Sequence, residues 1–109
     1  ISGLRRLFKI SWKSARTCNL GFWKNDFLKV SGFDEGYCGW GREDSDFVVR
    51  MQHAGCGILS ARLWCSVAHC WHRETDRSYF SDNDKIFNEI LSEKAAVFPR
   101  KSCVGKSRV

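Results

Sequence analysis

The sequence has 109 residues, a length that fits one domain rather than two. Hydrophobic residues make up 43% of it, which is enough for a packed core, but no apolar run is long enough to span a membrane. The net charge of +6 comes from the two ends, because residues 1–16 and 100–109 contain basic side chains and no acids. Such ends are candidates for contact with nucleic acid, anionic lipid or phosphate-bearing substrates.

The predicted elements are three short strands and three helices. Short apolar runs predict strands at residues 17–23, 57–63 and 65–71. The spacing of apolar residues predicts helices at residues 26–30, 43–54 and 83–94. Gly32 and Gly55 mark the ends of the first two helices. Residues 1–13 fit either a short amphipathic helix or an irregular basic lead-in.

The six cysteines have irregular spacing and include no Cys-x-x-Cys pair. Because no secretory signal is visible, we expect mostly reduced, buried thiols rather than disulfides. The first residue is Ile1 and not Met, which indicates a piece cut from a longer protein. The expected location is the cytoplasm, where the basic ends are candidates for peripheral contact with the inner face of the membrane.

The stretch from Gly39 to Asp46, Gly-Trp-Gly-Arg-Glu-Asp-Ser-Asp, is an aromatic loop that leads into an acidic helix start. Carboxylates are stabilised at a helix start by the free N–H groups and by the helix dipole. Asp44 lies on the inward edge of the apolar helix face, where helix capping and general-base catalysis are about equally supported. Asp46 and Arg50 are spaced as an i,i+4 ion pair, which we expect to face water.

Three segments occur in an order typical of one enzyme family. They are Cys18-Asn-Leu-Gly-Phe-Trp continuing to Glu35, the Gly39–Asp46 stretch, and His69-Cys-Trp-His72. Together they resemble the C-terminal part of family-2 glycosyltransferases, in particular the portion shared with the β1,4-galactosyltransferases and the polypeptide N-acetylgalactosaminyltransferases. The resemblance covers residues 16–87.

The resemblance implies an α/β chain, the C-terminal half of a GT-A (nucleotide-diphospho-sugar transferase) fold, with short strands and about three helices. Residues 1–15 would be a basic lead-in from a missing N-terminal half. Residues 16–98 would be the acceptor-binding and catalytic part of the glycosyltransferase. Residues 99–109 would form a disordered basic tail.

The resemblance also implies roles for individual residues. Asp44 matches the general base that deprotonates the acceptor hydroxyl, and Glu43 matches the neighbouring acid that helps to hold the acceptor. Trp40 matches a loop tryptophan that contacts sugar, and the glycines on either side of it would let the loop move over the bound donor. Further substrate contacts are expected from Asn19, Gly41 and Arg42. For Arg42, a solvated surface charge is the alternative.

The expected cofactor is Mn²⁺, or Mg²⁺, which would neutralise the charge of a leaving nucleoside diphosphate. His72 resembles the metal-ligating histidine of the family, whereas an alignment on Cys65-Ser66 favours His69, so the choice between them stays open. The Asp-x-Asp metal motif of the family would lie in the missing half. Residues 82–84 match that motif locally but look like a helix cap. The cramped spacing from Cys65 to His72 disfavours a zinc site.

The sequence therefore predicts a fragment of an inverting glycosyltransferase of polysaccharide biosynthesis, inactive on its own. It would transfer a hexose or N-acetylhexosamine from a nucleotide sugar, with a UDP-sugar favoured, to a glycan, lipid-linked or other hydroxyl acceptor. One alternative is a non-catalytic carbohydrate-binding or scaffold module derived from such an enzyme. The other, a basic nucleic-acid-binding domain, rests on charge alone, so we expect no nucleic-acid partner.

Overall fold

Helices are the only regular structure in the part of the chain that the computed structural model describes, residues 11–61, 64–93 and 99–101. In chain order they are the 3-10 helices η2 (Trp12–Ser14) and η3 (Thr17–Asn19) and the α-helices α1 (Lys24–Lys29), α2 (Glu43–His53) and α3 (Phe80–Ser92). Each α-helix overlaps a range that the apolar spacing predicts, although α3 begins before residue 83.

The expected α/β architecture, a GT-A half with short strands, is wrong for the described residues, none of which lies in a β-strand. Residues 17–23 form η3 and an irregular stretch, while residues 57–61 and 64–71 have mostly exposed side chains and no regular structure beyond a turn at Trp64. A strand needs a neighbouring strand to pair its backbone N–H and C=O groups. Because the described residues supply no such neighbour, β-propensity alone does not produce a sheet.

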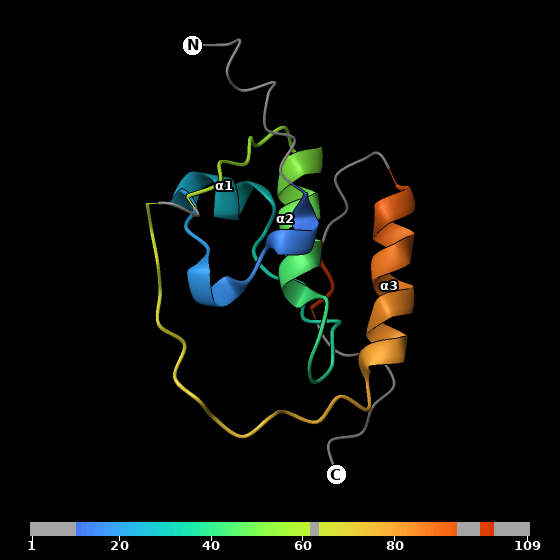
Figure 1. Cartoon of the computed structure of the whole chain (residues 1–109). Helices are drawn as coiled ribbons and strands as arrows, with labels where there is room; N and C mark the ends of the chain where they lie inside the picture. The colour runs from blue at the N-terminus through green and yellow to red at the C-terminus, as the bar shows by residue number, and fades with distance from the viewer. Residues whose placement is uncertain (1–10, 62–63, 94–98, 102–109) are drawn as a thin grey trace.

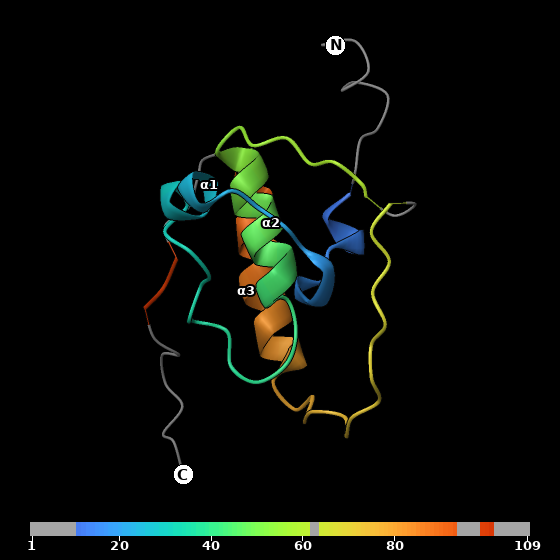
Figure 2. The same cartoon turned by 90° about the vertical axis from the view of Figure 1, so that its left-hand side faces the viewer.

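The helices α2 and α3 pack against each other and run in the same direction (Figures 1 and 2). A tight turn cannot join parallel helices, so the chain must return along the length of the pair. The described residues between α2 and α3 make this return as a long excursion outside the helices (Figure 1). The arrangement places the loop before α2 beside the first turn of α3.

The central element is α2, in which all residues from Ser45 to Met51 are buried. One hydrophobic cluster on α2 includes the end of α1 and consists of Val30, Phe47 and Met51. A second cluster joins α2 to α3 and consists of Val49, Phe87 and Ile90. Burying a side chain of this size contributes about 1.5–3 kcal/mol, so these two clusters hold α1 and α3 to α2.

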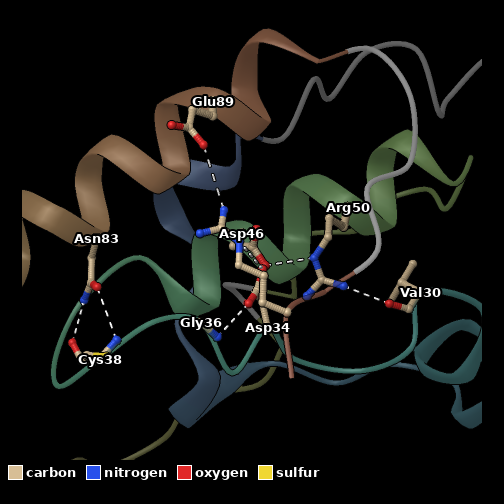
Figure 3. Close-up of polar contacts among 9 residues, drawn as sticks. Val30, Asp34, Gly36, Cys38, Asp46, Arg50, Asn83 and Glu89 are labelled. Atoms are coloured by element: carbon tan, nitrogen blue, oxygen red, sulfur yellow. Dashed lines mark hydrogen bonds and ion pairs between the residues drawn. The ribbon is translucent and has the colours of Figure 1, made fainter. Parts of the chain in front are cut away.

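The middle of α2 also buries an ion pair (Figure 3). Arg50 Nε donates a hydrogen bond to Asp46 Oδ2 at 2.8 Å, and both side chains are 0% exposed. Arg50 Nη1 donates to the carbonyl oxygen of Val30 at 2.8 Å and ties α2 to the end of α1. The predicted pairing is confirmed, but the expectation that it faces water is wrong. A helix covered on most sides has no solvent face, so its polar side chains must pair internally.

Burial changes the acid–base properties of the groups around this pair. It raises the pKa of the Asp46 carboxyl, and the charge and hydrogen bond of Arg50 oppose the shift. Burial also raises the pKa of the Tyr37 phenol, and the negative charges of Asp46 and Asp34 raise it further. The phenol therefore stays protonated at any ordinary pH.

The short segment 99–101 lies against the loop that precedes α2. The backbone N–H of Glu35 donates to the carbonyl oxygen of Arg100 at 2.9 Å. The Arg100 guanidinium lies 4.0 Å from the carboxylates of both Asp34 and Glu89. The first residues of the expected tail are therefore in contact with the helical part.

Other expectations fall partly outside the described residues. The lead-in at residues 1–10 and the tail at residues 102–109 are not described. Among the described helices, none combines the length and the apolar content that crossing a bilayer requires. Cys38 is disulfide-bonded, an exception to the expectation of mostly reduced thiols. Four other described cysteines are free thiols, but three of them are exposed and Cys56 is half-buried, so the expectation that the thiols are buried is wrong.

Replacing Arg50 by Met should destabilise the fold by about 3–5 kcal/mol, because it leaves the Asp46 carboxylate buried without its partner. Urea denaturation followed by circular dichroism measures the loss. The matched control is Lys85→Met, which removes an exposed ion pair with Asp82 and should change the free energy of unfolding by less than about 1 kcal/mol.

The double variant Asp46→Leu/Arg50→Met should recover most of the stability, because no unpaired charge then remains buried. Equal losses in Arg50→Met and Lys85→Met would contradict the structural role of the buried pair.

Candidate functional site

The loop before α2 enters the helix through residues with left-handed backbone conformations. Gly39 and Gly41, which flank Trp40, have φ values of 63° and 112°. Arg42 is the N-cap residue of α2 and has a φ of 76°, which is uncommon for a residue with a side chain. The backbone path therefore explains the two glycines, while Arg42 requires an additional explanation.

Close packing against the start of α3 is a second reason why these two positions require glycine. A Cβ atom at Gly39 would lie 2.9 Å from Cδ2 of Tyr79, and one at Gly41 would lie 2.8 Å from Cδ2 of Phe80. Neither position has room for a larger residue. We expected these glycines to let the loop move, whereas the structure gives them a packing role.

Polar side chains of α3 hold the loop from the other side. Asn83 is 1% exposed, and its Nδ2 donates to the carbonyl oxygens of Cys38 at 2.8 Å and Trp40 at 3.2 Å. Its Oδ1 accepts the N–H of Cys38 at 3.3 Å (Figure 3). Next to it, Asp84 Oδ1 accepts from Arg42 Nε at 2.7 Å and lies 2.6 Å from Arg42 Nη2. The first turn of α3 thus acts as a clamp on the loop.

The two acids with predicted catalytic roles make different contacts. Glu43 Oε2 accepts the N–H of Gly41 at 3.0 Å and thereby helps to close the loop. Asp44 Oδ2 accepts the N–H of Thr17, which lies 27 residues earlier, at 2.9 Å. A capping side chain accepts an N–H from its own helix, so Asp44 is not a helix cap. Asp44 Oδ1 is buried and has no hydrogen-bond partner among the described residues.

Trp40 lies at the surface beside this acidic helix start and is 39% exposed. Its ring contacts Phe80, with the ring centroids 5.6 Å apart. The guanidinium carbon of Arg77 lies 4.4 Å from the indole centroid, a distance typical of a cation–π contact. Arg77 is itself largely exposed and only loosely paired with Glu74, at 3.7 Å. The indole is therefore an aromatic surface that carries a displaceable arginine.

The remaining predicted residues lie on the exposed segments. Asn19 Nδ2 donates to the carbonyl oxygen of Cys65 at 3.3 Å and so links η3 to the excursion before α3. His69 and His72 are exposed, with their ring centroids 5.2 Å apart. His72 Nδ1 lies 2.9 Å from the carbonyl oxygen of Arg73. No described contact joins either histidine to the start of α2.

The expected metal site lacks a cluster of ligands among the described residues. Within the described ranges, no three His, Cys, Asp or Glu side chains come together as a group able to hold a metal ion. Mn²⁺ prefers about six ligands, mainly oxygens, and His69 with His72 would supply two nitrogens. These residues do not form a Mn²⁺ or Mg²⁺ site by themselves, so the metal requirement stays a prediction.

The profile of the family described as the N-terminal domain of galactosyltransferase matches residues 5–74. Because the match covers well over half of the 109 residues, the chain belongs to this family. It is therefore a galactosyltransferase-like domain, of the glycosyltransferase class in general. The description names an N-terminal domain, so the expected C-terminal placement in a family-2 enzyme stays a prediction. No curated protein and no solved structure matches the chain.

The sequence reasoning missed three residues that hold the candidate site together. No local signal marks Thr17, because only its backbone N–H is used. Residues 82–84 were interpreted as a helix cap, although Asn83 and Asp84 hold the loop. Asn83 lies four residues before the buried Phe87 and thus on the inward face of α3. An asparagine on the apolar face of the predicted helix was the sequence signal that could have indicated the role of Asn83.

Replacing Gly41 by Ala should lower the free energy of unfolding by about 1–3 kcal/mol, because the site combines a φ of 112° with a close approach to Phe80. Thermal and urea denaturation measure the change. Gly57→Ala is the matched control, since no atom lies within 4 Å of its Cβ position, and its effect should stay within about 0.5 kcal/mol. A fully stable Gly41→Ala variant would show that the loop does not need this conformation.

Proposed function

We propose that the chain carries the acceptor-side catalytic residues of an inverting glycosyltransferase. The enzyme would transfer a hexose or N-acetylhexosamine from a nucleotide sugar, with a UDP-sugar favoured, to a hydroxyl of a glycan or lipid-linked acceptor. Membership of the galactosyltransferase domain family supports the class of reaction. The observation that carries the residue assignment is the Asp44 carboxylate, which is fixed from outside its helix and keeps one oxygen unpartnered among the described residues.

The chemistry needs a carboxylate of this kind. In an inverting transfer, the acceptor hydroxyl attacks the anomeric carbon while the bond to the nucleoside diphosphate breaks, and a carboxylate removes the hydroxyl proton. The Thr17 N–H holds Asp44 Oδ2, which leaves Oδ1 to accept that proton. A buried oxygen without a hydrogen bond is unfavourable, and an arriving hydroxyl would supply the missing donor. Since Oδ1 is covered, the acceptor must displace the groups above it.

The neighbouring residues suit sugar binding. Trp40 offers an aromatic face on which the apolar face of a sugar ring can stack once Arg77 moves aside. Glu43 fixes Gly41 and so shapes the rim of the same loop. Asn19, two residues beyond Thr17, has its side-chain amide hydrogen-bonded to the carbonyl oxygen of Cys65 and stays a candidate for substrate contact. His69 and His72 remain candidates for binding Mn²⁺ or Mg²⁺ together with ligands from outside the described residues. Proton transfer to Asp44 does not depend on that metal.

The second candidate is a carbohydrate-binding module without turnover. The covered Oδ1 of Asp44 favours it, because this structure leaves no open path for a hydroxyl to that oxygen. Such a module would bind glycans through Trp40 but would release no nucleotide from any donor. The two candidates therefore differ in a single measurement, the release of UDP in the presence of an acceptor.

Asp44→Asn should lower transfer by about 10²–10⁴-fold, the usual contribution of a general base, while donor binding stays close to that of the wild type. The assay measures UDP release from UDP-galactose, UDP-glucose and their N-acetylated analogues by the full-length protein, with glycan acceptors and Mn²⁺. Calorimetry measures donor affinity.

The control is Asp76→Asn, an exposed carboxylate whose hydrogen bonds run to the nearby Ser78. It should leave transfer unchanged. Undiminished turnover of Asp44→Asn would sink the assignment of the base. Glycan binding by a wild-type protein that releases no UDP would instead establish the module.

A further inference from the structure

Arg42 occupies a place that contact with a substrate does not explain. Its guanidinium carbon lies over three aromatic rings, 5.7 Å from the centroid of Trp12, 5.2 Å from that of Phe80 and 5.3 Å from that of Phe87. These rings come from η2 and from α3. The side chain is 27% exposed, so most of it is enclosed by the protein. Its position is that of an internal brace between separate segments.

The positive charge of Arg42 is paired with the carboxylate of Asp84. Arg42 Nε and Nη2 both contact Asp84 Oδ1, at 2.7 Å and 2.6 Å. Two contacts from one planar guanidinium fix its orientation as well as its distance. Because Asp84 stands on α3, the contact connects the start of α2 to the neighbouring helix.

The backbone of Arg42 transmits that connection to Asp44. The carbonyl oxygen of Arg42 accepts the N–H of Asp46 at 2.8 Å, which is a hydrogen bond of the first turn of α2. The left-handed φ of Arg42 sets the angle at which the chain enters that turn. Such a conformation persists in a residue with a side chain only when its surroundings hold it. Asp84 and the three rings are those surroundings.

The same guanidinium also packs on the segment that leads to the donor of the Asp44 hydrogen bond. Trp12 packs on Arg42 and on Phe87, with ring centroids of Trp12 and Phe87 4.7 Å apart. Five residues later, the N–H of Thr17 donates to Asp44 Oδ2. Arg42 therefore lies next to both partners along the chain, two residues before Asp44 and, through Trp12, against the segment that leads to Thr17.

We propose that Arg42, held by Asp84, is a positioning residue that sets the orientation of the Asp44 carboxylate. It acts through the first turn of α2 and through the segment that carries Thr17. As a role in catalysis, this inference rests on the proposed function. As a statement about geometry, it can be tested without any substrate.

The test measures amide hydrogen exchange at Thr17 by NMR in the full chain. Arg42→Ala and Asp84→Asn should each accelerate exchange of the Thr17 amide by tenfold or more, which corresponds to about 1.4 kcal/mol of lost protection. Arg42→Lys keeps the charge but not the planar pair of contacts, so its effect should be intermediate. The control is Lys85→Ala, which alters an exposed neighbour of Asp84 and should leave Thr17 unchanged.

The amide of Arg50, in the buried middle of α2, reports whether the whole fold has been loosened. Arg42→Ala removes ring contacts as well and could unfold the chain, so Asp84→Asn is the deciding variant. Exchange that rises at Thr17 and not at Arg50 supports positioning. Unchanged exchange at Thr17, or an equal rise at both amides, overturns it.

Turnover separates this inference from the proposed function. In a wild-type protein that transfers sugar from a UDP donor, Asp84→Asn should lower kcat by about the same factor as it raises Thr17 exchange, with little change in the donor KM. A drop in kcat without a change at Thr17 overturns the positioning role and leaves the function intact. Faster exchange at Thr17 in a protein without transfer activity supports the geometric role and removes only the proposed function.

Discussion

The buried pair of Asp46 and Arg50 fixes the middle of α2 and the place where α1 meets it. A charge enclosed at 0% exposure is tolerable only with its partner and its hydrogen bonds in place. Arg50 also bonds to the carbonyl oxygen at Val30, so α1 cannot slide along α2 without breaking a charge-assisted contact. Hydrophobic contacts alone would permit many small shifts, because they have no direction. The ion pair selects one register among them.

The helices α2 and α3 then create the candidate site because their N-terminal ends are neighbours. The loop around Trp40 and the acids Glu43 and Asp44 belong to one end, while Asn83 and Asp84 belong to the other. Neither helix would hold the loop alone. Glycines supply the close approach, and the α3 side chains supply the hydrogen bonds. The site is thus a property of the helix pair rather than of the acidic motif.

The sequence was sufficient for features that depend on neighbours along the chain. Apolar spacing located the α-helices, the i,i+4 spacing paired Asp46 with Arg50, and the order of motifs indicated a galactosyltransferase-like chain. The predicted strands were wrong because a strand is stabilised by a partner that no local pattern guarantees. The burial of Asp46, the hydrogen bond from Thr17 and the disulfide of Cys38 were not predicted, for a similar reason. Each depends on residues that are distant in the sequence or on packing from several sides.

The separation between the loop and its clamp has a consequence for the order of folding. Cys38 and Asn83 are 45 residues apart, and closing a flexible loop of that length costs about 3 kcal/mol in chain entropy. The helices themselves form from local contacts, whereas contacts of such range come late and slow the search. During synthesis, the residues of α2 leave the ribosome well before those of α3. The acidic helix start is therefore synthesised before the residues that orient it, and the site is complete only once Asn83 and Asp84 are in place.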